Sequence, residues 1–279
     1  MAIHVDDRII MGEDERQIEE MLLKLENQFQ ITKTTNPKVY LRIQSERQPD
    51  GIHISQTNYA RQMLEKYNMQ ESQEMKTPMA TTPPTNDEGE NDIRFLYTEA
   101  VGSLLYMSSK TRPDMAFAVN VESRTLENPD KVAVQNAKRT LRYVKGTRDS
   151  GIKYTSSDSE TVKLEAFSDA DYAGDVKDRK SVTGYVIMMS GGPISWCSRK
   201  QSIVALSTTE AEYISAAECC KELKYLKTLI EELTGKRVEA ELCVDNQSAI
   251  KLIESGQVTR RSKHTDVRYH YISEQLKIL

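Results

Sequence analysis

The chain has 279 residues, a length that allows one or two domains of ordinary size. Its 42 acidic and 38 basic residues give a net charge of −4, which excludes a globally basic nucleic-acid binder but not a locally basic surface. Hydrophobic residues make up 38% and charged residues 29%, a balance that excludes disorder of the whole chain. No run of about 18 apolar residues occurs, so we expect no membrane span and no membrane partner.

The N-terminus and the cysteines indicate the compartment. The first seven residues lack the basic start and apolar core of a secretory signal. The four cysteines form no Cys-x-x-Cys pair and stand near no histidine cluster, so we expect neither a zinc site nor a disulfide framework. A reducing intracellular compartment, cytoplasm or nucleus, fits this pattern.

Residues 1–79 mix short strands and helices. Apolar runs at 3–5 and 9–10 predict a β-hairpin with Asp6 and Asp7 at its polar tip. Apolar residues at helical spacing predict a helix over 13–28, and residues 59–67 predict a short one. Residues 39–43 and 52–54 predict strands around the turn at 49–51. Two adjacent Asp residues usually shape a turn, but between apolar strands they can also hold a metal for nucleotidyl transfer.

A linker and a basic helix follow. Residues 80–92 contain Pro-Pro, Gly and several acids but no large apolar side chain, which predicts an exposed linker. Residues 131–148 carry six basic residues and no acid, and they predict an amphipathic helix. Its charged stripe is formed by Lys138, Arg142 and Lys145, and it is either a solvated face or a contact for a phosphate backbone.

From residue 162 the predicted order is strand, strand, strand, helix, strand, helix. The strands cover 162–167, 185–189, 194–197 and about 242–244, and the long helix covers 209–233 and ends at Gly235. Residues 190–193 predict the turn of a hairpin, and residues 248–254 begin the last helix. This order predicts a mixed α/β fold in which the last strand is parallel to an earlier one.

Four carboxylates stand at predicted strand ends or helix starts, and these meet at one edge of an α/β sheet. They are Asp169, Glu210, Asp245 and Asp266. Gathered at one place, they would repel one another unless cations such as two Mg²⁺ ions neutralised them. The alternative is ordinary helix capping, especially for Glu210 after Ser207-Thr208-Thr209.

Several motifs, in one order along the chain, resemble the ribonuclease H domain of copia-type (Pseudoviridae-like) retrotransposon Pol polyproteins. They are Ser-Asp-Ala-Asp-Tyr-Ala-Gly-Asp at 168–175, Val-Ala-Leu-Ser-Thr-Thr-Glu-Ala-Glu-Tyr at 204–213, Asp-Asn-Gln-Ser-Ala-Ile at 245–250 and Lys-His-Thr-Asp-Val-Arg-Tyr-His at 263–270. Upstream, Thr-Arg-Pro-Asp at 111–114, Leu-Arg-Tyr-Val-Lys-Gly-Thr at 141–147 and Val-Asp-Asp at 5–7 are similar to the reverse-transcriptase part of the same family.

The resemblance implies a domain plan and a fold class. Residues 1–79 would be a partial reverse-transcriptase palm fragment, 80–92 a linker, 93–150 a connection or thumb-like helical segment, and 151–279 the ribonuclease H-like domain. The implied fold class is α/β, a ribonuclease H-like mixed sheet with flanking helices, preceded by a partial palm and connection region of α+β type.

The resemblance also implies a reaction, the hydrolysis of the RNA strand of an RNA–DNA hybrid by an endonuclease with two Mg²⁺ ions, or Mn²⁺ in their place. The implied metal ligands are Asp169, Glu210, Asp245 and Asp266, whereas Asp171 and Glu212 receive no role. Lys138, Arg142 and Lys145 would approach the duplex, and other Pol subunits are potential partners. Of two residues near these motifs, we expect His264 to be structural or to contact substrate, and Trp196 to pack in the core.

The chain departs from the family in its polymerase part. It begins just before the hairpin, so the fingers and a further catalytic Asp are absent, and Asp6 and Asp7 would be the remnant of a polymerase metal site. A hairpin without its sheet neighbours is marginally stable. We therefore expect no DNA polymerase activity from this chain. The alternative to a nuclease is an inactive domesticated or relic fragment that at most binds nucleic acid.

Overall fold

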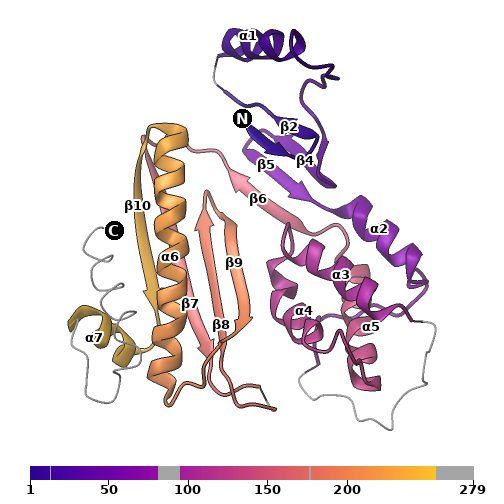
Figure 1. Ribbon diagram of the computed structural model, residues 1–279, viewed down its shortest axis with the longest axis vertical. Coiled ribbons are helices and arrows are strands. Elements are labelled where there is room, and N and C mark those ends of the chain that lie inside the picture. The colour runs from indigo at the N-terminus through magenta and orange to yellow at the C-terminus, as the bar shows by residue number, and fades with distance from the viewer. Residues whose placement is uncertain (13, 81–94, 176, 256–279) are drawn as a thin grey trace.

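A computed structural model (Figure 1) describes residues 1–12, 14–80, 95–175 and 177–255. The predicted linker at 80–92 falls almost wholly outside the described residues, and Asp266 and His264 also lie outside them. None of the described helices combines the length and the apolar character needed to cross a membrane.

The first part of the chain contains a small hairpin, a helix and the beginning of a sheet. Strands β1 (Ala2–His4) and β2 (Asp7–Ile9) pair antiparallel, which confirms the predicted hairpin. Helix α1 (Glu15–Glu26) has no buried residue. The strand expected over 39–43 is instead divided into β3 (Val39–Tyr40) and β4 (Ile43–Gln48), because Leu41 and Arg42 both have positive φ angles and turn the chain.

A second sheet joins distant parts of the sequence. Its order is β3-β4-β5-β6, with β5 (Gly51–Ser55) antiparallel to β6 (Gly151–Thr155). The two strands approach closely at Gly151, where a Cβ would lie 2.2 Å from the Ile54 carbonyl oxygen. By strand pairing β6 belongs with this sheet, although we expected residues 151–279 to form the last domain. The Tyr154 hydroxyl also donates to the Pro193 carbonyl, so β6 connects the two halves.

A helical unit lies between these two strands in sequence. It contains α2 (Thr57–Lys66), α3 (Tyr97–Ser108), the short 3₁₀ turn η1 (Pro113–Met115), α4 (Ala116–Ser123) and α5 (Lys131–Gly146). Its core contains Met63, Leu104, Met115 and Leu141 from four of these elements. The predicted apolar stripe of α5 is therefore confirmed as its buried face.

The last part is a mixed sheet covered by a long helix. Strands β7 (Thr161–Asp171), β8 (Val182–Met189), β9 (Gly192–Lys200) and β10 (Arg237–Val244) have the order β10-β7-β8-β9. Only β10 pairs in parallel, with β7, which confirms the predicted parallel last strand. Helix α6 (Thr208–Thr234) packs along one face of the sheet, and α7 (Gln247–Ser255) follows β10 (Figure 1).

The core of this part lies between the sheet and α6. Leu164, Ala166 and Ile187 from the strands pack with Cys219 and Leu223 from the helix. The helix ends at Gly235, whose φ of 65° places it in the left-handed region, as the sequence predicts. The described chain is thus of the mixed α/β class.

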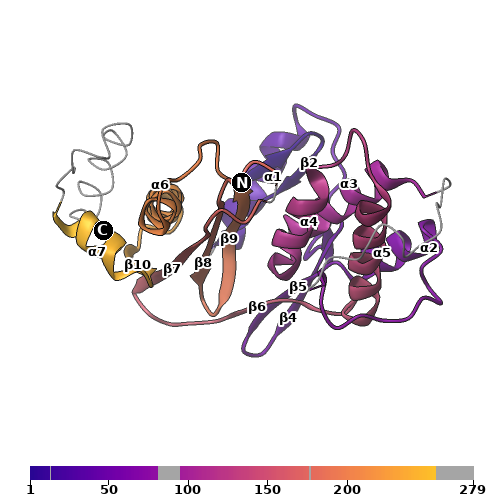
Figure 2. The same cartoon turned by 90° about the horizontal axis from the view of Figure 1, so that it is seen from below.

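Two contacts hold the helical unit against the other face of this sheet. The Trp196 indole nitrogen donates to the Ser108 carbonyl oxygen at 2.9 Å, and the Arg124 guanidinium pairs with the buried Asp175 carboxylate at 2.9 Å. Seen from below, α4 faces β9 on the side of the sheet away from α6 (Figure 2). The sheet is therefore enclosed by α6 on one face and partly by α4 on the other.

Candidate metal centre

Two of the predicted metal ligands lie at the same end of adjacent parallel strands. Asp169 is near the end of β7, and Asp245 directly follows β10. The pairing register sets Val244 beside Ser168, so each Asp follows a paired neighbour. Both strands point toward the lower end of the sheet in Figure 1, where α6 begins. The parallel pairing that the sequence predicts is what brings these two carboxylates together.

The third carboxylate of this group comes from the first turns of α6, and it is Glu212. One oxygen each of Asp169, Glu212 and Asp245 lies within 4.8 Å of the other two. Ser215, which lies nearly one turn further along α6, fixes the helix against the sheet. Its hydroxyl lies 2.7 Å from the Asp169 carbonyl oxygen and 3.0 Å from that of Gly184. The triad of Asp169, Glu212 and Asp245 is thus held by helix-to-strand hydrogen bonds.

Glu212 occupies an unfavourable position for an ionised carboxylate. Its residue is only 8% exposed, and its Oε2 atom has no hydrogen-bond partner. Burial, and then the negative charges of Asp169 and Asp245, raise the pKa of Glu212 to about 7. Because a proton or a cation is needed to relieve this repulsion, the triad has the donor set and the electrostatics of a divalent-cation site.

The structure does not bring Glu210, the ligand that we expected from α6, into this group of carboxylates. Its backbone amide donates to the Ser207 hydroxyl at 3.1 Å, and its own carboxylate accepts from the Leu206 amide at 2.7 Å. These bonds resemble a capping box, with the carboxylate accepting from the residue before the N-cap, and they keep the Glu210 side chain at the helix terminus. The capping alternative was correct for this residue, and the helix instead presents Glu212 to the strands.

The signal that could have found Glu212 is helical phase. Two residues along an α-helix correspond to a rotation of about 200° around its axis, so Glu210 and Glu212 cannot both face the sheet. The Ser-x-x-Glu spacing already gives Glu210 a role at the cap. Asp171, to which the sequence assigned no role, is exposed and lies outside the triad.

The predicted basic stripe on α5 is occupied by contacts within the protein. The Arg142 guanidinium donates to the Gln73 carbonyl at 2.8 Å, and the Lys145 ammonium donates to the Ser72 carbonyl at 2.7 Å. The Lys138 ammonium lies 5.3 Å from the centre of the Phe95 ring. The stripe therefore fastens the segment that follows α2 onto α5, and its expected contact with a nucleic-acid duplex stays a prediction.

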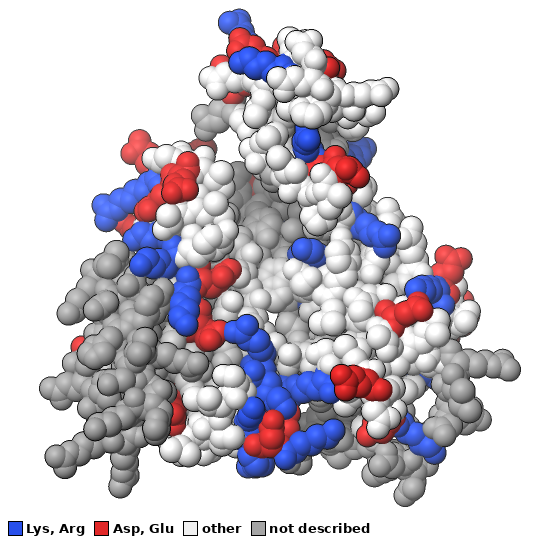
Figure 3. Space-filling view, viewed as in Figure 1, with Lys and Arg blue, Asp and Glu red and all other residues white. Residues whose placement is uncertain are grey.

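Other cations gather at the same end of the sheet as the triad, in a group that we call the cationic rim. It consists of residues from the β7–β8 connection and the end of β9, namely Lys177, Arg179, Lys180, Arg199 and Lys200. Figure 3 shows Lys and Arg side chains clustered in the lower middle of this view. Lys200 and Arg124 both pair with Asp175. Burial raises the pKa of Asp175, but the contact with Lys200 and hydrogen bonds from the Lys177 and Asp178 amides outweigh it and keep this pKa well below its usual range.

Comparison with known proteins places the chain in a family. Residues 1–81 match the family described as reverse transcriptase (RNA-dependent DNA polymerase). The chain is 40% identical over 287 aligned residues, and over 99% of its length, to the retrovirus-related Pol polyprotein from transposon TNT 1-94 of Nicotiana tabacum. The same share of the chain is 35% identical to the Pol polyprotein from transposon RE2 of Arabidopsis thaliana. The chain belongs to the copia-type retrotransposon Pol family.

This Pol segment covers only part of those relatives. It spans 21% of the TNT 1-94 polyprotein and 19% of the RE2 polyprotein. It is also 31% identical over 230 residues to an uncharacterized mitochondrial protein of Arabidopsis thaliana, AtMg00810, which it covers to 93% while using 81% of its own length. No solved structure matches the chain.

The predicted polymerase remnant of the Pol segment lies on the small N-terminal hairpin. Asp6 lies in its turn and Asp7 begins β2; both are exposed, and β1 and β2 form a sheet of their own. Within the described ranges, no third His, Cys, Asp or Glu side chain joins these two in a group able to hold a metal. The hairpin thus places the two carboxylates at its tip, and the described residues assemble no metal centre around them.

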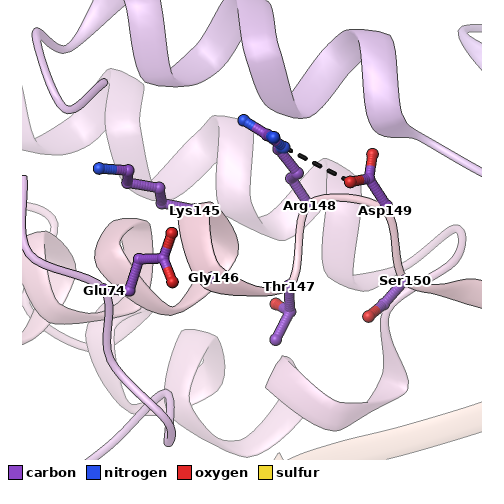
Figure 4. Close-up of a pocket in the computed structure, with 7 residues that line it drawn as sticks. All are labelled: Glu74, Lys145, Gly146, Thr147, Arg148, Asp149 and Ser150. Carbon is purple, nitrogen blue, oxygen red and sulfur yellow. Dashed lines mark hydrogen bonds and ion pairs between the residues drawn. The ribbon is translucent and has the colours of Figure 1, made fainter. Parts of the chain in front are cut away.

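A separate pocket of about 380 Å³ opens at the end of α5 (Figure 4). Two cationic and two anionic side chains line it, and one pair of them, Arg148 and Asp149, lies 3.4 Å apart. Lys145 is already bonded to a backbone carbonyl, and Glu74 stands over Gly146. Because the opposite charges balance, this pocket lacks the one-sided charge of a phosphate or metal site.

Proposed function

We propose that this Pol segment hydrolyses the RNA strand of RNA–DNA hybrids at the triad of Asp169, Glu212 and Asp245. The observation that carries the proposal is the buried Glu212 carboxylate, which faces two other acids and has an unpartnered oxygen. The unit from β7 to α7 supports a ribonuclease H-like fold, since three antiparallel strands are extended by a parallel strand on the far side of β7. The reaction places this part of the chain among the hydrolases.

The residues of the triad fit divalent metal ions. Asp169, Glu212 and Asp245 would hold them, with Asp266 as a fourth ligand proposed from its motif. Carboxylate oxygens suit Mg²⁺, with Mn²⁺ as the alternative, and the reverse-transcriptase family generally uses divalent metals. When bound, such ions supply a hydroxide nucleophile and stabilise the phosphoryl transition state.

The chain itself keeps the ligands in place. Ser207 caps α6, and Ser215 bonds this helix to β7 and β8, so Glu212 is held on a rigid element. Asn246 accepts from the amides of Ser248 and Ala249, which starts α7 directly after Asp245. Hydrogen bonds of this kind orient carboxylates before substrate arrives, which is what electrostatic catalysis requires.

The cationic rim, rather than the α5 stripe, is proposed to contact the nucleic-acid backbone. Lys177 and Arg179 are exposed and lie in the connection that follows β7, a strand that ends two residues beyond Asp169. Phosphates that bind there would be close to the phosphate at the triad. Contacts to 2′-hydroxyl groups would distinguish the RNA strand from DNA.

We propose no polymerase activity for this chain, because Asp6 and Asp7 stand on an isolated two-stranded hairpin. Incubation with a primed template, deoxynucleotides and Mg²⁺ tests this directly. Primer extension that Asp7→Asn abolishes would contradict it.

The nuclease proposal is tested by three matched variants in a hybrid-cleavage assay. We expect Mg²⁺-dependent cleavage of the RNA strand by the full chain, and its loss in Asp245→Asn and in Glu212→Gln. Glu210→Gln is the control on the same helix, and it should retain cleavage because its carboxylate only caps α6. Loss of cleavage in Glu210→Gln but not in Glu212→Gln would overturn the assignment of the triad. Salt-sensitive hybrid binding by a folded chain without any cleavage would instead identify the alternative, an inactive relic.

A further inference from the structure

A groove of about 370 Å³ lies on the face of the sheet opposite α6, and two acids of β7, Asp169 and Asp171, line it. Strand pairing sets Phe167 beside Val186 and Val186 beside Trp196, so these three side chains form one row across the sheet. The next row on the same face contains Asp169 and Gly184. Phe117 from α4 forms the opposite wall. The groove is therefore a space between the helical unit and the sheet that reaches Asp169 of the triad.

Gly184 keeps space free beside Asp169. It lies in the interior of β8, where glycine is a poor strand former, and its φ is not in the left-handed region. A Cβ built at Gly184 would find its nearest neighbour at 3.6 Å, the Asp169 carbonyl oxygen, which is an ordinary contact. Neither the backbone conformation nor the packing of the described residues requires a glycine here. Glycines inside strands often mark a bulge, a tight bend or a place where a ligand approaches the backbone closely, and the last of these fits Gly184, which lines the groove.

Two aromatic side chains line this groove while remaining open to solvent. Phe117 is 43% exposed and Phe167 is 46% exposed, and they are two of the four phenylalanines in the chain. Exposed aromatic rings in a groove are stacking surfaces for nucleobases, because every base has a π face. The cationic rim lies at the same end of the sheet, since Val182 at the groove pairs with Lys200. Negative phosphates next to the groove would therefore find opposite charge.

We propose that the groove binds one nucleotide of the RNA strand, with its base against Phe117 and Phe167 and its ribose over Gly184. The proposal rests on the proposed function, because it makes the groove continuous with the phosphate at the triad. Its volume lies at the lower end of the range for small-ligand pockets, which suits one nucleotide rather than a duplex. Phe117 and Phe167 are thus positioning residues that set the register of the strand.

Trp196, the single tryptophan of the chain, lines the groove and provides an intrinsic probe. The full chain is titrated with a short RNA–DNA hybrid in Ca²⁺, and the Trp196 emission is recorded. We expect the emission to change on binding, and Phe117→Ala to weaken the apparent affinity about tenfold, as the loss of one stacked base predicts. Gly184→Val should weaken binding at least as much, because its side chain fills the space beside Asp169. Phe29→Ala, which removes an exposed phenylalanine far along the chain from the groove, is the matched control and should bind as the unaltered chain does.

The outcomes separate this proposal from the nuclease proposal. Circular dichroism and urea unfolding show that each variant is folded, and Phe167→Ala gives a second surface substitution if Gly184→Val is not. Hybrid cleavage with an unchanged KM in both phenylalanine variants would overturn the groove and leave the nuclease proposal standing. A Trp196 response that these variants abolish, without cleavage in Mg²⁺, would support the groove and refute the nuclease. An emission change that depends on protein concentration alone would assign the groove to a second copy of the chain and overturn the proposal.

Discussion

Glu122 is a buried acid outside the candidate site, and its protonation should control the stability of the helical unit. It lies on α4 with 3% of its surface exposed. Its Oε1 atom accepts from the Thr140 hydroxyl at 2.6 Å, whereas its Oε2 atom has no partner. Burial raises its pKa from 4.5 to about 7, although the hydrogen bond from Thr140 lowers it slightly. Glu122→Gln keeps the side-chain size and the acceptor for Thr140 but removes the charge.

The raised pKa of Glu122 sets the direction in which the free energy of unfolding changes with pH. The folded chain holds the Glu122 proton more tightly than the unfolded chain, so this contribution to stability is complete below pH 4.5 and is lost as the pH rises through about 7. Each tenfold change in proton affinity is worth about 1.4 kcal/mol, so the full loss is about 3 kcal/mol. The neutral Gln side chain has no such loss. We therefore expect Glu122→Gln to be more stable than the unaltered chain by about 3 kcal/mol at pH 8 and to lose most of that advantage at pH 5.

Urea unfolding followed by circular dichroism at pH 5 and pH 8 measures this difference for the two chains. Glu99→Gln is the matched control, since Glu99 lies on the neighbouring α3 but is exposed in an ion pair with Lys66. Surface pairs contribute at most about 1 kcal/mol, so its effect should be small at both pH values. A stability difference between Glu122→Gln and the unaltered chain that is equal at pH 5 and pH 8 would refute the reasoning.

Two further predictions concern the cationic rim and the α5 stripe, and the pairing of β5 with β6. Lys177→Gln should weaken hybrid binding and reduce its salt dependence by about one counterion. Arg142→Gln should instead lower the free energy of unfolding and leave the salt dependence of binding unchanged. Anisotropy titrations at several salt concentrations measure the salt dependence, and the opposite pattern in the two variants would contradict the prediction. Gly151→Ala should destabilise the sheet that contains β5 and β6, because its Cβ would lie 2.2 Å from the Ile54 carbonyl oxygen, and an unfolding midpoint equal to that of the unaltered chain would show that the strands separate without cost.

Local patterns predicted those parts of the fold that depend on neighbouring residues. The hairpin around Asp6, the helix ending at Gly235 and the parallel placement of β10 all follow from periodicity and turn residues. Asp169 and Asp245 meet because their strands are parallel and adjacent, which element order alone suggests. The pairing of β5 with β6 was not predictable in this way, since about a hundred residues separate the two strands and either strand could pair elsewhere.

The contacts of the basic stripe on α5 were likewise not predictable from local sequence, because they depend on residues far away in the chain. The sequence shows correctly that residues 131–148 carry six basic residues and no acid, but it does not show which part of the molecule they contact. In the structure that surface is the segment after α2, whose carbonyl groups at Ser72 and Gln73 accept from Lys145 and Arg142. A carbonyl oxygen satisfies an ammonium or guanidinium group as a phosphate oxygen does. Cationic composition therefore identifies a candidate surface only after long-range backbone contacts are known.

The change from Glu210 to Glu212 has a consequence for how motifs in such chains are carried over. Two glutamates in one short motif differ by about 200° around the helix, so an error of two residues moves the proposed ligand from the sheet to the cap. The hydrogen bonds at the start of α6 favour Glu212 as the proposed ligand, because the Glu210 carboxylate accepts from the Leu206 amide at 2.7 Å and is held at the terminus. The remaining glutamate is buried against two acids, a position that costs stability unless a proton or a cation neutralises the charge there. Local helix chemistry and long-range electrostatics thus agree on one residue, and a cleavage assay on Glu210→Gln and Glu212→Gln separates the cap from the ligand.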